Sequence, residues 1–121
     1  MNDLKLGVVD EKFADIVWRN APISTGELVK RCEEELHWKR PTTYSAIRKF
    51  CQNGIFRMEN RFVSVLVTKE ELQGKQSAKF VEDVFSGSLP AFIAAFTSRK
   101  KLTVQEVEDI QKMIDSAKEE L

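Results

Sequence analysis

The stretch from residue 37 to residue 67 constrains this chain more than any other, because a short helical pattern passes directly into two strand-like runs. Pro41 suits the first turn of a helix, where its missing N–H costs nothing, and Gly54 suits the end. Residues 55–58 and 62–67 are rich in β-forming side chains, and a tight turn fits between them. A short helix followed by a β-hairpin predicts the recognition helix and wing of a winged helix-turn-helix domain.

The helical pattern in this stretch has one apolar face and one polar face. Apolar residues recur at helical spacing along one side, namely Tyr44, Ile47, Phe50 and Cys51. The opposite side carries hydroxyl, amide and basic side chains, namely Thr42, Ser45, Arg48, Lys49 and Gln52. We therefore expect the first side to pack on a core and the second to remain exposed.

Two further helices are predicted ahead of this stretch. Residues 24–27, Ser-Thr-Gly-Glu, form a capping-box pattern, in which a hydroxyl and a carboxylate satisfy free backbone N–H groups at a helix start. The helix that follows has an apolar face made of Leu28, Val29, Cys32 and Leu36. An earlier helix ends at residues 20–22, and its apolar face is made of Val9, Phe13, Ile16, Val17 and Trp18. Helices this short are not stable alone, so the three are expected to share one core.

The length of the chain allows one domain, or a small domain with an appendage. We expect its 121 residues to form a winged helix-turn-helix domain over residues 1–68 and a helical region over residues 69–121, which makes the fold mainly α with a small β-wing. No apolar run reaches membrane-spanning length and no secretory signal is visible, so we expect a cytoplasmic protein without membrane insertion. Cys32 and Cys51 lie on predicted apolar faces and are expected to be buried free thiols.

Charge is distributed unevenly along the chain, although the net charge is zero. Residues 37–61 hold six Lys or Arg and a single acid, whereas residues 69–121 hold eight Lys or Arg against ten Asp or Glu. A basic surface on an otherwise acidic protein is expected when only one face meets the phosphates of a nucleic acid.

Duplex DNA is therefore the partner that this basic window predicts. The candidate DNA-binding residues are Lys39, Arg40, Thr42, Thr43, Ser45, Arg48, Lys49, Arg57 and Arg61. Structural alternatives exist for most of them. Arg48 and Lys49 can form a solvated helix face, and Thr42 can cap the helix. Arg57 and Arg61 can instead be charges that protect an edge strand from aggregation.

The last third of the chain contains three helical patterns. A capping-box pattern at residues 68–71 can start a helix that Gly74 weakens, and a stronger pattern begins near Ser77. Ser88 is a good N-cap for a second helix, and residues 103–106 form another capping box before a third. So small a unit cannot easily bury all of its apolar side chains within one chain. We predict a homodimer built by Phe80, Val84, Phe85, Leu89, Phe92, Ile93, Phe96, Val107, Ile110 and Ile114.

No catalytic or metal-binding set is recognisable in the sequence. His37 is the only histidine, and no cysteine or carboxylate cluster lies beside it at ligand spacing. Residues 33–35 form an acidic run that is typical of a solvated helix face. We find no combination of nucleophile, base and orienting group, and no Gly-rich phosphate loop. The protein is therefore predicted to be a non-enzyme without a metal or cofactor.

The order of these motifs resembles the penicillinase repressor family, also called the BlaI/MecI/CopY family. Trp18 matches a Trp that ends the family's first helix, and residues 38–45 match its Trp-Ser-Pro-Lys-Thr-Ile-x-Thr segment. Residues 47–50 with Gly54 match its Leu-x-Arg-Leu-x-x-x-Gly run, and segments within residues 77–106 match its aromatic-rich helical tail. The resemblance thus covers nearly the whole chain.

The chain departs from the family pattern at several positions. The family's Lys before the first Thr is Pro41 here, its second Thr is Ser45, and its Arg is Lys49. The CxCxxxxCxC metal motif that ends copper-responsive relatives is missing, which removes copper sensing by that route.

The resemblance implies a dimeric transcriptional repressor that binds a palindromic operator through the third helix and wing, with antibiotic-resistance or stress genes as expected targets. It also implies a membrane receptor-protease pathway that cleaves the tail before a Phe, which corresponds to the Ala95–Phe96 bond. The helical spacing of Phe96 favours the alternative that this residue is part of a core. A second function class remains open, a winged-helix adaptor that binds protein instead of DNA, and the basic window favours the repressor.

Overall fold

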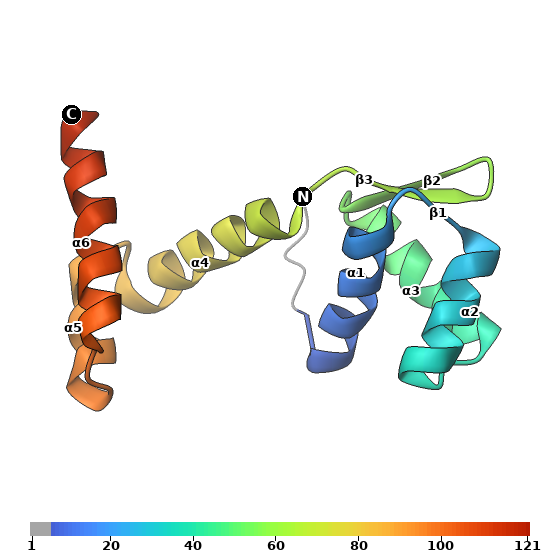
Figure 1. Ribbon diagram of the computed structural model, residues 1–121, viewed down its shortest axis with the longest axis horizontal. Helices are drawn as coiled ribbons and strands as arrows, with labels where there is room; N and C mark the ends of the chain where they lie inside the picture. Colours follow the sequence, from blue (N-terminus) through green and yellow to red (C-terminus); the bar gives the residue numbers. More distant parts are fainter. Residues whose placement is uncertain (1–5) are drawn as a thin grey trace. The chain divides into compact units, whose positions relative to one another are not determined.

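The computed structural model describes residues 6–121, and the chain divides into two compact units at Lys75. We call these the winged unit, which ends at Lys75, and the tail unit, Gln76–Leu121. The described elements are α1 (Val8–Asn20), β1 (Ile23–Ser24), α2 (Thr25–Leu36), α3 (Arg40–Gln52), β2 (Phe56–Glu59), β3 (Phe62–Val65), α4 (Lys69–Phe85), α5 (Leu89–Arg99) and α6 (Val104–Glu119) (Figure 1). The predicted fold class, mainly α with a small β-wing and a helical tail, is confirmed.

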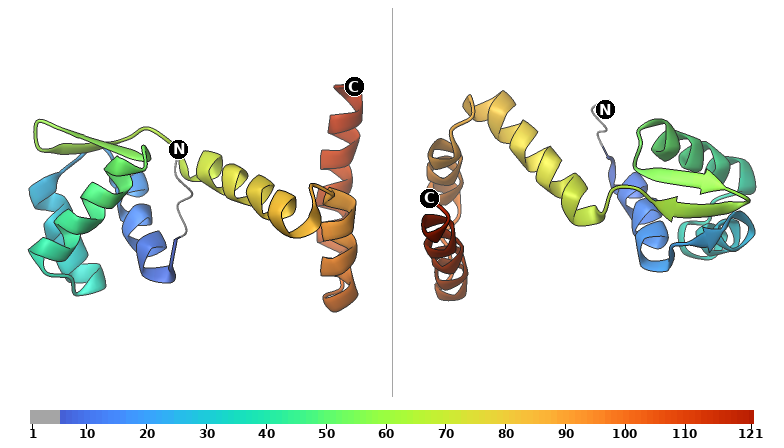
Figure 2. Two further views of the ribbon diagram at one scale, coloured as in Figure 1. Left: turned by 180° about the vertical axis from the view of Figure 1, so that it is seen from behind. Right: turned by 90° about the horizontal axis from the view of Figure 1, so that it is seen from above.

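Aromatic rings form the centre of the core of the winged unit. Phe13 of α1, Phe50 of α3 and Phe56 of β2 are almost completely buried, and the ring centroids of Phe50 and Phe56 are 5.1 Å apart. Trp38 stacks on Phe13 at 5.6 Å, and Trp18 meets Phe56 edge-on at 5.7 Å. Burial of each large side chain contributes roughly 1.5–3 kcal/mol. The core therefore joins α1, α3 and the wing into one body, in which the three helices gather on one side of the sheet (Figure 2).

Local signals determine where α2 and α3 begin and end. The Ser24 hydroxyl accepts a hydrogen bond of 3.1 Å from the backbone N–H of Glu27 at the start of α2. Pro41 lies in the first turn of α3, as predicted. The helix ends before Gly54, whose φ of 72° is a conformation that glycine adopts without steric cost.

The wing is a hairpin with a two-residue turn. Glu59 pairs with Phe62, which leaves Asn60 and Arg61 as the turn, with φ values of 52° and 63°. Positive φ at both central positions is typical of a type I′ turn, whose twist matches that of the flanking strands. The central strand β3 also pairs with β1. The sequence did not predict β1, because a two-residue strand is too short to show an alternating pattern.

Helix α4 starts at the capping-box pattern of residues 68–71, where the Thr68 hydroxyl accepts a hydrogen bond of 3.1 Å from the N–H of Glu71. One helix runs from Lys69 to Phe85 and passes through Gly74, so the stronger pattern from Ser77 is the second half of the same helix. A glycine inside a helix costs about 1 kcal/mol relative to alanine, which is too little to end a helix of 17 residues. The boundary between the two units therefore lies inside α4, whereas the predicted division at residue 68 lies just before it.

The caps predicted for the two last helices are present. The Ser88 hydroxyl accepts a hydrogen bond from the N–H of Ala91 at the start of α5. Thr103 and Glu106 form both hydrogen bonds of a capping box at the start of α6, and these bonds lower the pKa of the Glu106 carboxyl. No single helix within residues 6–121 is long and apolar enough to cross a membrane; only the sharply bent pair α4–α5 reaches that length and composition together.

Candidate nucleic-acid interface

The exposed side of α3 carries several of the predicted DNA-binding residues. Thr42, Ser45 and Lys49 follow one another at spacings of three and four residues, so they lie on one stripe of the helix. Arg48 lies beside this stripe, and all four residues are exposed. The opposite side of the helix packs into the core through Ile47 and its neighbours.

The start of α3 is basic and has no side-chain cap. Lys39, the N-cap residue, makes no capping hydrogen bond, and the first turn contains no acidic residue. The N-terminal end of a helix carries partial positive charge on its free N–H groups. Lys39 and Arg40 are both exposed and add two full positive charges at this end. A negatively charged group such as a phosphate is therefore favoured there.

The basic side chains differ in their local partners. Arg48 donates to the Ser45 hydroxyl over 3.3 Å. Lys49 forms an ion pair with Asp10 of α1, with 2.8 Å between Nζ and Oδ2. On the wing, Arg57 forms an ion pair with Glu59, with 2.9 Å between Nη2 and Oε2. Within residues 6–121, no ion pair involves Lys39, Arg40, Arg48 or Arg61.

A groove lies between α3, the wing and the start of α2. It has a volume of about 760 Å³ and is lined by Arg40 and Tyr44 of α3, Met58 and Arg61 of the wing, and Gly26 of α2. A helix in the major groove of DNA and a wing at the adjacent minor groove are separated by one sugar-phosphate strand. Two arginines in this position are suited to such a strand.

The prediction that Thr43 binds DNA was wrong. It is fully buried, beside Cys32 of α2. Residue 43 precedes Ile47 by four positions and therefore shares its face of the helix, a signal that the sequence already contained. Thr43 cannot reach DNA from the core, and we remove it from the candidate interface.

Both cysteines are free thiols in the winged unit, as predicted, with Cys32 buried and Cys51 half-buried. Burial raises the pKa of the Cys32 thiol, and the neighbouring Thr43 hydroxyl opposes this rise. Burial likewise raises the pKa of Cys51. The raised pKa values keep both thiols mainly protonated at neutral pH.

The family of the chain follows from its sequence as a whole. Residues 6–116 match the family model described as penicillinase repressor. The chain belongs to the penicillinase repressor family. Methicillin resistance regulatory protein MecI of Staphylococcus aureus is 18% identical over 108 residues, which cover 86% of this chain and 88% of MecI. MecI of Mammaliicoccus sciuri is 18% identical over 105 residues, which cover 84% of this chain and 85% of that protein.

Penicillinase repressors are transcriptional repressors rather than enzymes, and the predicted family resemblance is confirmed. The match extends through residue 116 and so includes most of the tail unit as well as the winged unit. Within residues 6–121, no group of three or more His, Cys, Asp or Glu side chains is placed to hold a metal ion.

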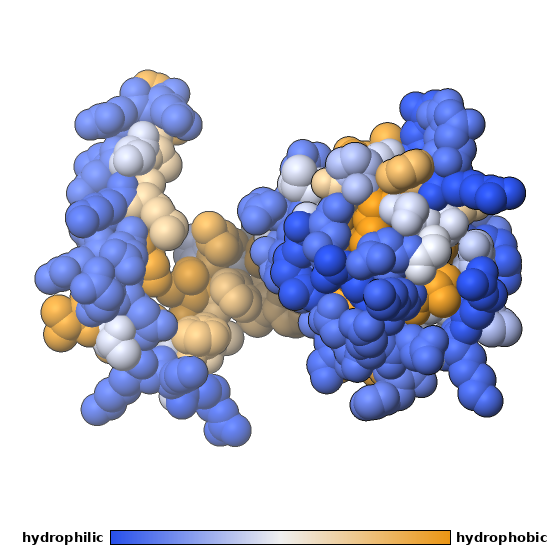
Figure 3. Space-filling model, turned by 45° about the vertical axis from the view of Figure 1, so that its right-hand side comes forward, coloured by the Kyte–Doolittle hydropathy of each residue, from blue (hydrophilic) through white to orange (hydrophobic). Residues whose placement is uncertain are grey.

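The tail unit of this penicillinase repressor leaves apolar side chains open to solvent (Figure 3). Four phenylalanine rings contact one another in this unit, with 5.6 Å between the centroids of Phe85 and Phe92. Even so, Phe80 and Phe96 remain 50% and 44% exposed. Of the ten predicted dimerisation residues, three are half-buried, namely Phe85, Phe92 and Ile110. Seven are exposed, namely Phe80, Val84, Leu89, Ile93, Phe96, Val107 and Ile114.

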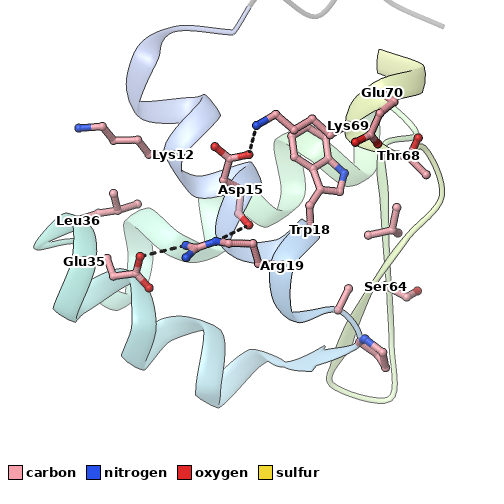
Figure 4. A pocket seen from close by; sticks show the side chains of 13 residues that line it. Lys12, Asp15, Trp18, Arg19, Glu35, Leu36, Ser64, Thr68, Lys69 and Glu70 are labelled. Atoms are coloured by element: carbon pink, nitrogen blue, oxygen red, sulfur yellow. Dashed lines mark hydrogen bonds and ion pairs between the residues drawn. The ribbon is translucent and has the colours of Figure 1, made fainter. Parts of the chain in front are cut away.

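A second groove, of about 1040 Å³, lies where α1 meets the start of α4 (Figure 4). The indole N–H of Trp18 donates to the carbonyl of Val67 over 3.1 Å. Lys69 forms an ion pair of 2.9 Å with Asp15, and this hydrogen bond raises the pKa of Lys69. These contacts hold the first turn of α4 against α1. We interpret the groove as a by-product of the packing between α1 and the start of α4 rather than as a ligand site.

Proposed function

We propose that this protein is a homodimeric transcriptional repressor that inserts α3 into the major groove of a palindromic operator and lays its wing along the adjacent backbone. Membership of a repressor family supports the proposal. The observation that carries it is the set of exposed cations on α3 and its N-cap, Lys39, Arg40 and Arg48, none of which pairs with an acid within residues 6–121. Their charges are available to DNA.

The residues of α3 suit different parts of a DNA duplex. Lys39 and Arg40 lie at the uncapped helix start, where a phosphate is favoured by both the side chains and the helix dipole. Thr42 and Ser45 are exposed hydroxyls that can bond either phosphates or base edges. Arg48 is long enough to reach the two acceptors that guanine presents in the major groove. The basic helix start would therefore position the protein, and the middle of α3 would read sequence.

The wing suits the backbone more than the bases. Arg61 sits in the turn at one wall of the groove between α3 and the wing, and no acid within residues 6–121 pairs with it. Arg57 is partly neutralised by Glu59 on the same strand. We therefore propose Arg61 as the stronger phosphate contact of the two.

A homodimer follows from what the tail leaves exposed and from what an operator requires. One winged unit reads a half-site, whereas two units related by a two-fold axis match a palindrome. Each large side chain buried between two copies contributes about 1.5–3 kcal/mol, so a few of the seven exposed apolar residues suffice for micromolar or tighter association. Sedimentation equilibrium on the full chain tests this. A protein that is still monomeric at tens of micromolar, a concentration above the expected dissociation constant, contradicts the proposal.

The target genes and the induction signal are part of the same proposal. The relatives in Staphylococcus aureus are named methicillin resistance regulatory proteins. We propose that this protein acts in the cytoplasm and that its targets are antibiotic-resistance or stress genes. Cleavage by a receptor-protease pathway at Ala95–Phe96 would require local unwinding, because this bond lies inside α5. Immunoblots of the native host after exposure to cell-wall antibiotics test this route, and protein that stays intact contradicts it.

The decisive experiment is a binding titration of the full chain with a random-sequence duplex at two salt concentrations. Phosphate contacts release counterions, so the affinity should fall steeply as salt rises. The competing hypothesis, a winged-helix adaptor for protein partners, predicts no salt-dependent binding to DNA. Sequencing of genomic fragments that co-purify with the repressor would then identify the operator.

A further inference from the structure

A carboxylate lies at the edge of the proposed DNA-binding face. Asp10 of α1 places its Oδ2 atom 2.8 Å from Nζ of Lys49 on α3. The Asp10 side chain is 26% exposed and that of Lys49 is 44% exposed. The carboxylate is therefore held closer to the body of the protein, while the ammonium group reaches across from the exposed stripe of α3 to meet it.

The ion pair makes two neighbouring cations of α3 unequal. Lys49 shares its stripe with Thr42 and Ser45, so it is on the side of α3 that would face DNA. Arg48 donates to the neutral Ser45 hydroxyl and keeps its full charge. The Lys49–Asp10 pair has a net charge of zero. Among the basic residues of α3, Lys49 alone forms an ion pair with a described residue.

We propose that Asp10 competes with DNA phosphate for Lys49 and thereby lowers the affinity of this repressor for duplex DNA of any sequence. The inference rests on the proposed DNA-binding function. A phosphate that approaches Lys49 must either displace the carboxylate or accept its repulsion. In both cases the gain from neutralising one phosphate is reduced.

The consequence for a repressor concerns the balance between two kinds of contact. Sequence-independent affinity grows with each phosphate that a protein neutralises, whereas base contacts determine where it remains bound. A carboxylate beside Lys49 limits the sequence-independent affinity and leaves the contacts of Thr42, Ser45 and Arg48 unchanged. Asp10 would thus shorten the time that the protein spends on DNA other than its operator.

The test compares the full-length wild type with Asp10→Asn, which removes the charge and keeps the size of the side chain. Binding to a random-sequence duplex is measured across a salt series. Asp10→Asn should bind more tightly at low salt, and its plot of log affinity against log salt should be steeper by about 0.9 per chain. The advantage over wild type should therefore shrink by about threefold per chain between roughly 50 and 200 mM salt.

Asp15→Asn is the matched control. It removes the same charge from the same helix, but it releases Lys69 at the start of α4, outside the proposed interface. Its affinity for the duplex should equal that of wild type. An equal gain in Asp10→Asn and Asp15→Asn would mean that only net charge matters, which overturns the proposal.

A second pair of variants separates the ion pair from other effects of Asp10. In a Lys49→Gln background, Asp10→Asn should no longer change the affinity, and a gain that persists there overturns the proposal. Lys49→Gln by itself should reduce the salt slope much less than Lys39→Gln does, because Lys39 is the unpaired phosphate contact, and an equal loss overturns the proposal even where Asp10→Asn fails to fold. If wild type binds the duplex and Asp10→Asn binds equally well, only this inference fails. If wild type itself does not bind, the proposed function fails with it.

Discussion

The winged unit and the tail unit are built from amphipathic helices of similar length, yet only the winged unit buries their apolar faces. Helices α1 and α3 have 13 residues each, and α5 and α6 have 11 and 16. Phe13 and Phe50 are fully buried in the winged unit, whereas Phe80 and Phe96 of the tail unit remain about half exposed. The difference teaches that apolar spacing identifies which face of a helix must be buried. It does not identify the element that packs against that face.

The number of elements that converge on one point explains the difference. In the winged unit, α1, α3 and β2 each contribute one ring, and Phe13, Phe50 and Phe56 all contact one another. In the tail unit, the phenylalanine rings meet one another at the ends of α4 and α5, and no residue of α5 or α6 is fully buried. A second copy of the chain is the cover that we propose for the tail.

The largest expected effect is the loss of a ring from the complete core. Phe50→Ala should destabilise the winged unit by about 3–5 kcal/mol, because it leaves a cavity that its neighbours cannot fill. Urea unfolding followed by tryptophan fluorescence measures this unit alone, since Trp18 and Trp38 both belong to it. Phe96→Ala should leave that transition nearly unchanged. Equal shifts for the two variants would contradict the contrast between the units.

A charge placed on the exposed face of the tail should separate the two copies. Ile93→Asp is expected to raise the dimer dissociation constant at least tenfold, because about 1.5–3 kcal/mol of apolar burial is lost at each copy. Sedimentation equilibrium measures this change, and the tryptophan-monitored unfolding should remain as in wild type. Ser98→Asp adds the same charge to the same helix at an exposed polar position and serves as the control. Equal dimerisation of Ile93→Asp and wild type would remove this face from the proposed interface.

A smaller effect is expected at the exposed face of α3. Arg48→Ala should weaken operator binding by about 1–3 kcal/mol and relax sequence preference, because Arg48 is proposed to read a base, while the unfolding transition stays unchanged. Adding Lys49→Ala should weaken binding only slightly more, because Asp10 already neutralises that side chain. Fluorescence anisotropy with the natural operator measures both variants. A double variant that binds as tightly as wild type would show that α3 is not the recognition helix.

The smallest expected effect concerns the two thiols of the winged unit. Because burial raises the pKa of Cys32 and Cys51, the thiolate fraction at neutral pH is lower than for a free cysteine, and it increases only as the pH approaches the raised values. A thiol-reactive dye should label the native protein slowly and the urea-unfolded protein rapidly. A Cys51→Ser variant isolates Cys32, which should react more slowly still. Equal rates for the native and unfolded protein would mean that the winged core opens readily.

Much of the candidate site could be predicted because its signals are local. Pro41 and Gly54 act on the chain within one turn, so the predicted limits of α3 were correct. The wing followed from β-forming residues on both sides of a short turn. Thr43 was assigned to the wrong side because its residue type suited DNA, although its spacing from Ile47 placed it in the core.

The sequence by itself determined the helices, the hairpin, the basic window and the apolar excess of the tail, because caps, turn residues and periodicity act between neighbours in the chain. Only the tertiary structure decided which side chains meet across long separations. Strand β1 exists because β3 lies beside it, and Lys49 has a counter-ion because α1 brings Asp10 to it from 39 residues away. Such pairs depend on how the elements pack, and packing depends on the whole core rather than on any segment of it.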